Sequence, residues 1–258
     1  MSGKVYLVGA GPGSPDLLTM RAARLLAQAD VVFYDALIHP ETLELAVRAE
    51  KIAVGKRCGR HSTAQRFINK RLIDAALKYE VIVRLKGGDP MIFARSQEEI
   101  DALEEVGISV EVVPGVTAAL AAAAQLRVSL TRRGVSRNFA IATPRVGAGE
   151  TTSNWTAALS GADTAAIYMG AAQAGQVTSA LLAQGHRPDT PVALCESVSM
   201  PQFRALRGTL SKLPELCQKL GNGPAVILLG KVFENTGAAT SAKCTDPVDL
   251  NSLAATAR

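Results

Sequence analysis

The stretch VIVRLKGGDPMIFARSQEE, residues 81–99, holds a strand-like run, an abrupt turn and the start of a helix in immediate succession. The first six residues are mostly apolar, which is the pattern of a buried strand. Gly87-Gly88-Asp89-Pro90 then ends the run, because Gly and Pro interrupt regular structure. Taken alone, such a turn is either simple punctuation or a loop that offers a carboxylate and bare backbone to a ligand.

The same succession repeats on both sides of this stretch. Short apolar runs alternate with longer segments in which apolar residues recur at spacings of three and four, and this alternation predicts a mainly parallel sheet covered by helices. The expected strands are Val5–Val8, Val31–Tyr34, Ile52–Val54, Val81–Leu85 and Val110–Val113. The expected helices are Leu17–Gln28, Pro40–Arg48, Thr63–Tyr79 and Glu98–Val106.

Residues that favour helix ends agree with these predicted helices. Asp16 precedes the first helix, Ser62 and Thr63 precede the third, and Gly107 follows the fourth. After Pro114-Gly115 an Ala-rich helix leads into a second series of runs, which predicts a second α/β domain. Its expected strands are Phe139–Ala142, Ala165–Met169, Val192–Cys195, Phe203–Leu206 and Val226–Leu229, and its helices are Trp155–Leu159, Gln173–Gln184 and Leu210–Leu220.

Composition sets the domain count and the class of protein. A chain of 258 residues with 48% hydrophobic and 20% charged residues suits two modest α/β domains. We expect an N-terminal domain over residues 1–115, a C-terminal domain over 116–236, and a disordered tail over 237–258, where small and polar residues dominate. No apolar stretch has the roughly 18–20 residues that a membrane helix needs, so no membrane partner is expected.

Charged residues and cysteines indicate which class of ligand and which cellular compartment suit the chain. The net charge of +5 is mild, but basic residues gather at 56–61 and at 132–145. Either cluster could be a solvated surface; without interleaved aromatics they do not favour nucleic acid, and they fit a small polyanion better. Four cysteines, at 58, 195, 217 and 244, have neither metal-ligand nor redox spacing, which predicts reduced thiols in the cytoplasm and no metal.

The first glycine loop, GAGPGSPDLLT at residues 9–19, follows the first expected strand. Glycines there allow backbone N–H groups to approach a ligand, and Asp35 after the second strand could reach a ribose. A nicotinamide-dependent oxidoreductase is therefore one alternative. However, Ser14 occupies the last glycine position of the dinucleotide fingerprint, and Pro12 and Pro15 each remove an N–H. A plain turn and another small-molecule loop remain open.

Two further loops, VPGVTAA at 113–119 and YMG at 168–170, also follow expected strands and are rich in small residues. Together with the loops at 9–19 and 87–90 they make four. Each has a simpler explanation by itself: Thr117 fits a helix cap, and Met169 fits a core residue. Open α/β sheets bind ligands at the carboxyl edge of their strands. Convergence of the loops at one edge would therefore predict a binding site.

Seven segments, in their order along the chain, resemble the tetrapyrrole methyltransferases. They are GAGPGSPDLLT, ADVVFYDALI (29–38), VGKRCGRHS (54–62), RLKGGDP (84–90), VPGVTAA, YMG and GPAVILLG (223–230). The resemblance covers roughly residues 3–233. It implies two α/β domains of the class III methyltransferase type, with S-adenosyl-L-methionine in the cleft between them and S-adenosyl-L-homocysteine as product. It also implies a homodimer, and it is strongest to the members that methylate uroporphyrinogen III at C2 and C7 to give precorrin-2.

The resemblance assigns roles to particular positions. The catalytic group would comprise Arg95, Asp35, Lys56 and Glu98. Contacts to the methyl donor would come from Pro12, Gly87, Gly88, Asp89, Ile92, Thr117, Ala118, Met169, Val198 and Ala225. The carboxylates of the substrate would meet Arg133, Arg132, Arg57, Arg60 and His61.

These residue types suit methyl transfer to an octacarboxylate. Arginines grip carboxylates in bidentate fashion, the sulfonium activates the methyl group without a metal, and a base must remove a proton after the transfer. Arg95 paired with Glu98 is the first candidate for managing that proton, although an arginine is rarely neutral; Asp35 is the chemically easier base and Lys56 the easier acid.

The sequence also departs from the family pattern. Met91, Ala94 and Ser96 replace Phe and two Gly residues, Arg132 replaces a histidine, and Pro144 lies where the family has a histidine. These departures keep a non-catalytic S-adenosyl-L-methionine or tetrapyrrole binder as an alternative. A later precorrin as substrate is a further alternative, which GKRCGRH at 55–61 disfavours because it matches the uroporphyrinogen-specific members.

Overall fold

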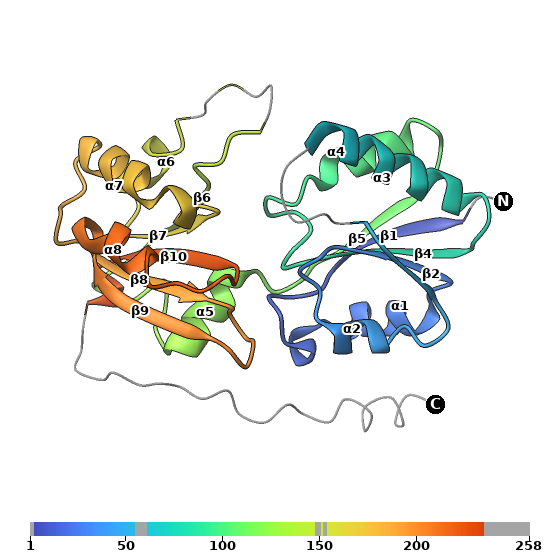
Figure 1. Ribbon diagram of the computed structural model, residues 1–258, viewed down its shortest axis with the longest axis horizontal. Helices are drawn as coiled ribbons and strands as arrows, with labels where there is room; N and C mark the ends of the chain where they lie inside the picture. Colours follow the sequence, from blue (N-terminus) through green and yellow to red (C-terminus); the bar gives the residue numbers. More distant parts are fainter. Residues whose placement is uncertain (1–2, 55–60, 148–150, 152–153, 235–258) are drawn as a thin grey trace. The chain divides into compact units, whose positions relative to one another are not determined.

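The computed structural model describes residues 3–54, 61–147, 151 and 154–234. The chain forms two compact units that adjoin in sequence between Thr117 and Ala118. Each unit has its own five-stranded sheet (Figure 1). The predicted tail, and Lys56, Arg57 and Arg60 of the predicted site, lie outside the described residues.

The sheet of the first unit is entirely parallel, as the alternation of runs predicts. Its strand order is β3-β2-β4-β1-β5, so β4 and β1 lie in the interior of the sheet. All five expected strands are present, as β1 Lys4–Gly9, β2 Val31–Tyr34, β3 Glu50–Ala53, β4 Val81–Lys86 and β5 Val110–Val113.

Helices cover both faces of this sheet. Figure 1 shows α3 (His61–Ala76) and α4 (Ser96–Glu104) on one face and α1 (Met20–Gln28) and α2 (Pro40–Glu44) on the other. Alternate residues of each strand face opposite sides. Val5, Leu7 and Ile82 therefore pack in a core cluster with residues of α3 and α4, whereas Val8 and Val83 pack with residues of α1.

Helix ends differ from the sequence prediction at the first helix. Pro15–Leu17 form a separate 3-10 turn, and Thr19 caps α1 by accepting a hydrogen bond from the N–H of Ala22 at 3.2 Å. The prediction of Asp16 was wrong because the proline-rich loop needs a turn of its own before the helix starts. Ser62 and Thr63 fall inside α3 and do not precede it. Gly107 follows α4 in the turn after its last residue, Glu104, and has φ of +75°.

The second unit has a mixed sheet in the order β6-β7-β10-β8-β9. Only β6 and β7 pair in parallel, and the other three pairings are antiparallel. Local apolar runs carry no strand direction, so the sequence pattern predicts these strands but not how they pair. Their bounds are β6 Phe139–Ala142, β7 Thr164–Tyr168, β8 Pro191–Glu196, β9 Arg204–Thr209 and β10 Ala225–Gly230.

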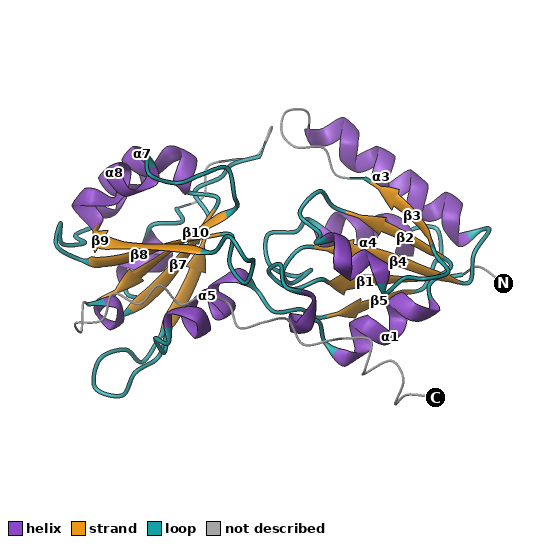
Figure 2. Ribbon diagram, turned by 60° about the horizontal axis from the view of Figure 1, so that its bottom comes forward, coloured by secondary structure: helices purple, strands orange, loops and turns teal. Residues whose placement is uncertain are grey.

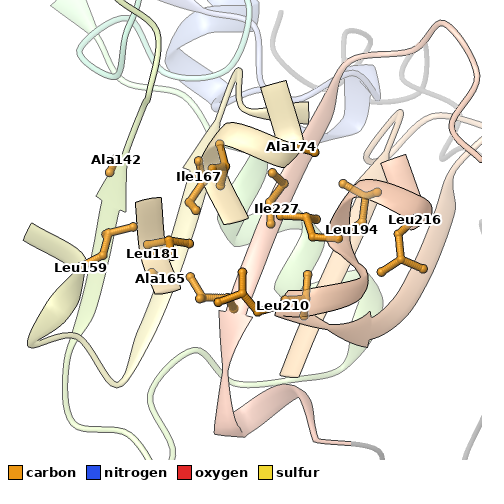
Figure 3. Packing of buried hydrophobic residues seen from close by; sticks show 14 residues of the cluster. Ala142, Leu159, Ala165, Ile167, Ala174, Leu181, Leu194, Leu210, Leu216 and Ile227 are labelled. Carbon is orange, nitrogen blue, oxygen red and sulfur yellow. The ribbon is translucent and has the colours of Figure 1, made fainter. Parts of the chain in front are cut away.

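Helices again lie on both sides of the sheet (Figures 1 and 2), with α5 on the face opposite α7 and α8. Figure 3 shows the core between the sheet and α7, which includes Leu181 of α7 and Ile167 and Ile227 of the sheet. The helices are α5 Ala118–Leu126, α6 Ala157–Ser160, α7 Ala174–Ala183 and α8 Leu213–Cys217, and further 3-10 turns are Ala171–Gln173, Leu210–Lys212 and Lys231–Phe233. Among the described residues, no helix combines the length and apolar character of a membrane span.

Candidate active site

Three of the four predicted loops converge at the carboxyl edge of the first sheet. The loop after β1 and the loop after β4 pair through Gly11 and Gly88, whose backbone groups exchange hydrogen bonds of 3.2 Å and 2.7 Å. The loop after β5 joins them through Gly115, whose N–H donates to Oδ2 of Asp89 at 2.9 Å. The expected convergence is thus present within this unit.

Glycines make this close approach possible. A Cβ atom on Gly115 would lie 2.3 Å from the carbonyl oxygen of Gly88, and one on Gly9 would lie 2.6 Å from the Cα of Gly115. Gly88 itself has φ of +68°, a conformation that favours glycine. The three backbones therefore interlock without side chains between them.

The surface above the β4 loop is open, in contrast. A Cβ on Gly88 would meet nothing within 4 Å, and one on Gly87 would meet only Leu37, at 3.6 Å. Asp89 does not point its carboxylate away from the loop: Oδ1 accepts from the N–H of Met91 at 2.8 Å, and Oδ2 accepts from Gly115. Asp89 therefore fixes the loop, and the loop offers the half-buried backbone of Gly87 and Gly88 to a ligand.

Arg95 and Glu98 form a double contact at the start of α4. Nε of Arg95 donates to Oε1 and Nη2 to Oε2 of Glu98, both at 2.7 Å. Both side chains are more than 40% exposed. Arg95 has φ of +55° and Phe93 of +52°. Such conformations are strained in residues with a Cβ and concentrate at functional sites.

A charged cluster lies buried beneath this edge. Arg84 of β4 contacts Asp35 at 2.6 Å and Glu99 at 3.1 Å, and Lys86 contacts Glu99 at 2.7 Å. Gln65 of α3 also donates to Glu99, at 3.1 Å. Arg84, Lys86 and Glu99 are at most 3% exposed, whereas the Asp35 side chain is 29% exposed. Asp35 therefore forms the accessible end of an otherwise buried network.

The pKa values of the two buried cations of the network shift in opposite directions. Burial and the neighbouring charge of Arg84 hold the pKa of Lys86 below its usual value, despite the ion pair with Glu99. Burial also lowers the pKa of Arg84, but Asp35 and Glu99 outweigh it and raise that pKa overall. Arg84 is thus the firmly charged member.

Sequence inspection missed this network. Arg84 and Lys86 stand in the opening stretch, and their spacing of two places them on one face of a strand. That signal predicts two charges on the same side of a buried strand, where ions need partners. It does not predict Glu99 as the partner, since the pairing depends on how α4 packs.

In the second unit, Met169 directly follows β7, is 39% exposed and has φ of +56°. Arg145 lies beside it, with 3.8 Å between Nη1 and the Sδ atom of Met169. Val198 is buried and follows β8 between Ser197 and Ser199, which have φ of +53° and +63°. These predicted positions fall at strand ends, where backbone strain again accumulates.

The remaining predicted residues are placed as follows. Pro12 and Ile92 are half-buried, Thr117 is buried immediately before α5, and Ala118 and Ala225 are the first residues of α5 and β10. Arg132 and Arg133 are exposed in a turn after α5, which is closed by a 2.8 Å hydrogen bond from the N–H of Ser136 to the carbonyl of Arg132. His61 is the first residue of α3. No cluster of metal-ligating side chains occurs within the described part of the chain.

Comparison with known proteins gives a consistent result. Residues 4–214 match the family model "Tetrapyrrole (Corrin/Porphyrin) Methylases". Siroheme synthase of Zymomonas mobilis is 43% identical over 231 residues, which are 89% of this chain and 49% of the relative. The chain spans about half the length of the curated relatives it matches.

Two solved structures from Thermus thermophilus cover nearly all of both chains. The native form of uroporphyrin III C-methyl transferase has a TM-score of 0.79 and 35% identity, and the match covers 97% of this chain and 100% of that one. The same enzyme complexed with S-adenyl homocysteine has a TM-score of 0.77 and 37% identity, with coverage of 89% and 98%.

Proposed function

Since the chain belongs to the tetrapyrrole methylase family, we propose that it transfers methyl groups from S-adenosyl-L-methionine to C2 and C7 of uroporphyrinogen III, giving precorrin-2. The observation that carries the proposal is the similarity to uroporphyrin III C-methyl transferase over 100% of that chain. The comparisons do not favour the nicotinamide-dependent oxidoreductase. Ser14 and Pro12, which depart from the dinucleotide-binding fingerprint, also argue against it.

The loop after β4, at the carboxyl edge of the first sheet, suits the methyl donor. Open space above Gly87 and Gly88 leaves room for a ligand against bare backbone, while Asp89 holds the loop in shape. When bound, S-adenosyl-L-methionine supplies an electrophilic methyl group on its sulfonium. The predicted contacts from Pro12, Ile92, Thr117, Ala118, Met169, Val198 and Ala225 belong to this proposal.

Asp35 is our choice of proton acceptor. It is a carboxylate at the carboxyl edge of the sheet, partly exposed and supported from below by Arg84. Methylation of a pyrrole carbon leaves positive charge that is relieved by loss of a proton, and a carboxylate can accept that proton. Arg95 has its guanidinium engaged by Glu98, so we assign this pair to orienting the substrate instead of the base role.

The substrate carries eight carboxylates, and exposed arginines suit it. Arg132, Arg133 and Arg145 are exposed in the second unit, and guanidinium groups bind carboxylates in bidentate fashion. Roles for Lys56, Arg57, Arg60 and His61 stay predictions. The cytoplasmic location and the homodimer also remain proposals, and the mass of the native protein in solution tests the latter.

An anaerobic assay tests the function. Purified protein, S-adenosyl-L-methionine and uroporphyrinogen III should yield a doubly methylated product by mass spectrometry. Binding of S-adenosyl-L-homocysteine without any methylated product would contradict the assignment and favour the non-catalytic binder. Turnover only with a later precorrin would keep the reaction type and change the substrate.

A further inference from the structure

Arg84 is held from three sides and directed at Asp35. Its Nε donates to Oε1 of Glu99 at 3.1 Å, its Nη1 donates to the carbonyl of Leu85 at 3.1 Å, and its Nη2 donates to Oδ1 of Asp35 at 2.6 Å. Within the described part of the chain, this guanidinium is the one donor to the Asp35 carboxylate. Each edge of the planar group thus has a separate partner.

The parallel sheet brings these residues together. β2 and β4 are neighbours, with Phe33 opposite Arg84, and Asp35 is the first residue beyond β2. Arg84 lies two residues after Ile82, so it faces the side of the sheet covered by α3 and α4. From that side α4 supplies Glu99, while Asp35 lies at the edge.

Glu99 is a fixed anchor for Arg84. It is fully buried and accepts hydrogen bonds from Arg84, Lys86 and Gln65. With Asp35 included, the network contains two cations and two anions, so its charges balance. Exposure rises from 0% at Glu99 through 3% at Arg84 to 29% at Asp35. A rigid, buried base therefore supports one accessible carboxylate.

We propose that Arg84 is a positioning residue for the methyl transfer: anchored by Glu99, it holds the Asp35 carboxylate in one direction and balances its charge, so that Asp35 can accept the proton released by the pyrrole. The inference rests on the proposed function and on Asp35 as the acceptor. It assigns Arg84 no contact with substrate or methyl donor. Its effect on the reaction passes through Asp35 alone.

Lysine is the informative replacement. Arg84→Lys keeps a positive charge, but an ammonium group is a point donor that lacks the planar fork of a guanidinium. It cannot reproduce the three separate contacts that fix the direction of the group. We expect kcat to fall by about ten- to 100-fold, since small misplacements of reacting groups have effects of this size. The KM for uroporphyrinogen III and the affinity for S-adenosyl-L-homocysteine should stay unchanged.

A double-substitution cycle separates positioning from simple structural support. In an Asp35→Asn background, measured in single-turnover assays, Arg84→Lys should cause no further loss, because the group it positions is already gone. A further loss of tenfold or more in that background would overturn the proposal. Arg187→Lys is the matched control: Arg187 makes a comparable two-pronged contact with Asp189 but is exposed in the second unit, and no change is expected.

A crystal structure of Arg84→Lys provides a readout without turnover. We expect the Asp35 carboxylate to leave its single direction, by rotation or by a second conformer. An unchanged carboxylate would overturn the proposal even if the wild type proved inactive. Inactivity of the wild type itself would contradict the proposed function instead. If Arg84→Lys does not fold, Glu99→Gln weakens the anchor with little change of shape, and its smaller loss of kcat should likewise vanish in the Asp35→Asn background.

Discussion

At the scale of single residues, the contact between the three loops at the carboxyl edge of the first sheet depends on two glycines. Gly9 and Gly115 pack against each other and against the carbonyl of Gly88. Gly115 could be identified in the sequence as part of a strand–loop–helix junction, but its need to be glycine could not. That need arises from a loop more than twenty residues away, which only the folded sheet brings into contact.

Gly115→Ala should destabilise the protein. The added Cβ would lie 2.3 Å from the carbonyl oxygen of Gly88, so the loops must separate. Overpacking of this kind costs about 1–3 kcal/mol, and urea unfolding measures it. Gly175→Ala is the control: its Cβ would meet nothing within 4 Å in α7, and alanine there should raise stability by about 0.5–1 kcal/mol. Equal effects at both positions would contradict the interlock.

Substitution of Asp89 should weaken binding of the methyl donor, whereas substitution of Arg95 should lower turnover. Asp89→Ala removes the acceptor for the N–H groups of Met91 and Gly115. Calorimetry should therefore show weaker binding of S-adenosyl-L-homocysteine, by about tenfold for each 1.4 kcal/mol of binding free energy lost. Asp89→Asn keeps an oxygen acceptor and should lose less.

Arg95→Ala should spare that binding and lower turnover by about 100-fold, the scale at which misplaced reactants slow a reaction. Arg187→Ala removes a similar exposed ion pair in the second unit and serves as its control. A loss of donor affinity in Arg95→Ala with normal turnover would reverse the two assignments.

At the scale of elements, every predicted strand is present in the structure, but strand direction is confirmed only in the first unit. Runs such as Val31–Tyr34 identify buried strands by composition, because a parallel sheet needs apolar residues on both faces. The antiparallel pairing of β8 with β9 follows from how distant segments meet, and no short pattern encodes it. The same reason explains why the spacing of Arg84 and Lys86 could have indicated a buried pair of charges, whereas no pattern indicated their partner Glu99.

The edge strand β5 is tied to β1 and α1 through Glu111, which pairs with Lys4 at 2.7 Å and also with Arg21. The hydrogen bond from Lys4 lowers the pKa of Glu111 from its ordinary 4.5, and the same bond raises the pKa of Lys4 above 10.5. A lowered carboxyl pKa contributes stability above the ordinary value, and that stability is lost as pH falls through the folded value.

Glu111→Gln should therefore be slightly less stable than the wild type in neutral buffer, because it loses these exposed ion pairs. The difference should shrink as the buffer becomes acidic and disappear below the folded pKa of Glu111. Chemical unfolding at a series of pH values measures it. A difference that persists in strong acid would mean that packing, and not charge, holds β5 in place.

At the scale of the whole molecule, basic residues exceed acidic ones, with 28 Lys+Arg against 23 Asp+Glu. The excess is small, yet arginines such as Arg132, Arg133 and Arg137 stand exposed on one connecting segment of the second unit. The proposed substrate carries eight carboxylates, and such positions should attract it over distances longer than a hydrogen bond.

Raising the salt concentration should therefore weaken substrate binding more than donor binding. The Debye length falls from about 10 Å at 0.1 M to about 3 Å at 1 M salt, so KM for uroporphyrinogen III should rise several-fold across this range. The affinity for S-adenosyl-L-homocysteine, which has no large net charge, should change much less. Equal salt dependence of both would argue against arginine-guided substrate binding.

The buried network of Arg84, Lys86 and Glu99 also matters to anyone who adapts this chain for industrial use. Well-packed apolar residues in place of buried ion networks often leave proteins equally stable or stabilise them by about 1–4 kcal/mol. A search guided only by heat resistance would thus tend to replace these three residues. If Arg84 supports Asp35, the variants selected in this way would be heat-stable but inactive. Each round of mutagenesis therefore needs selection for turnover as well as for stability.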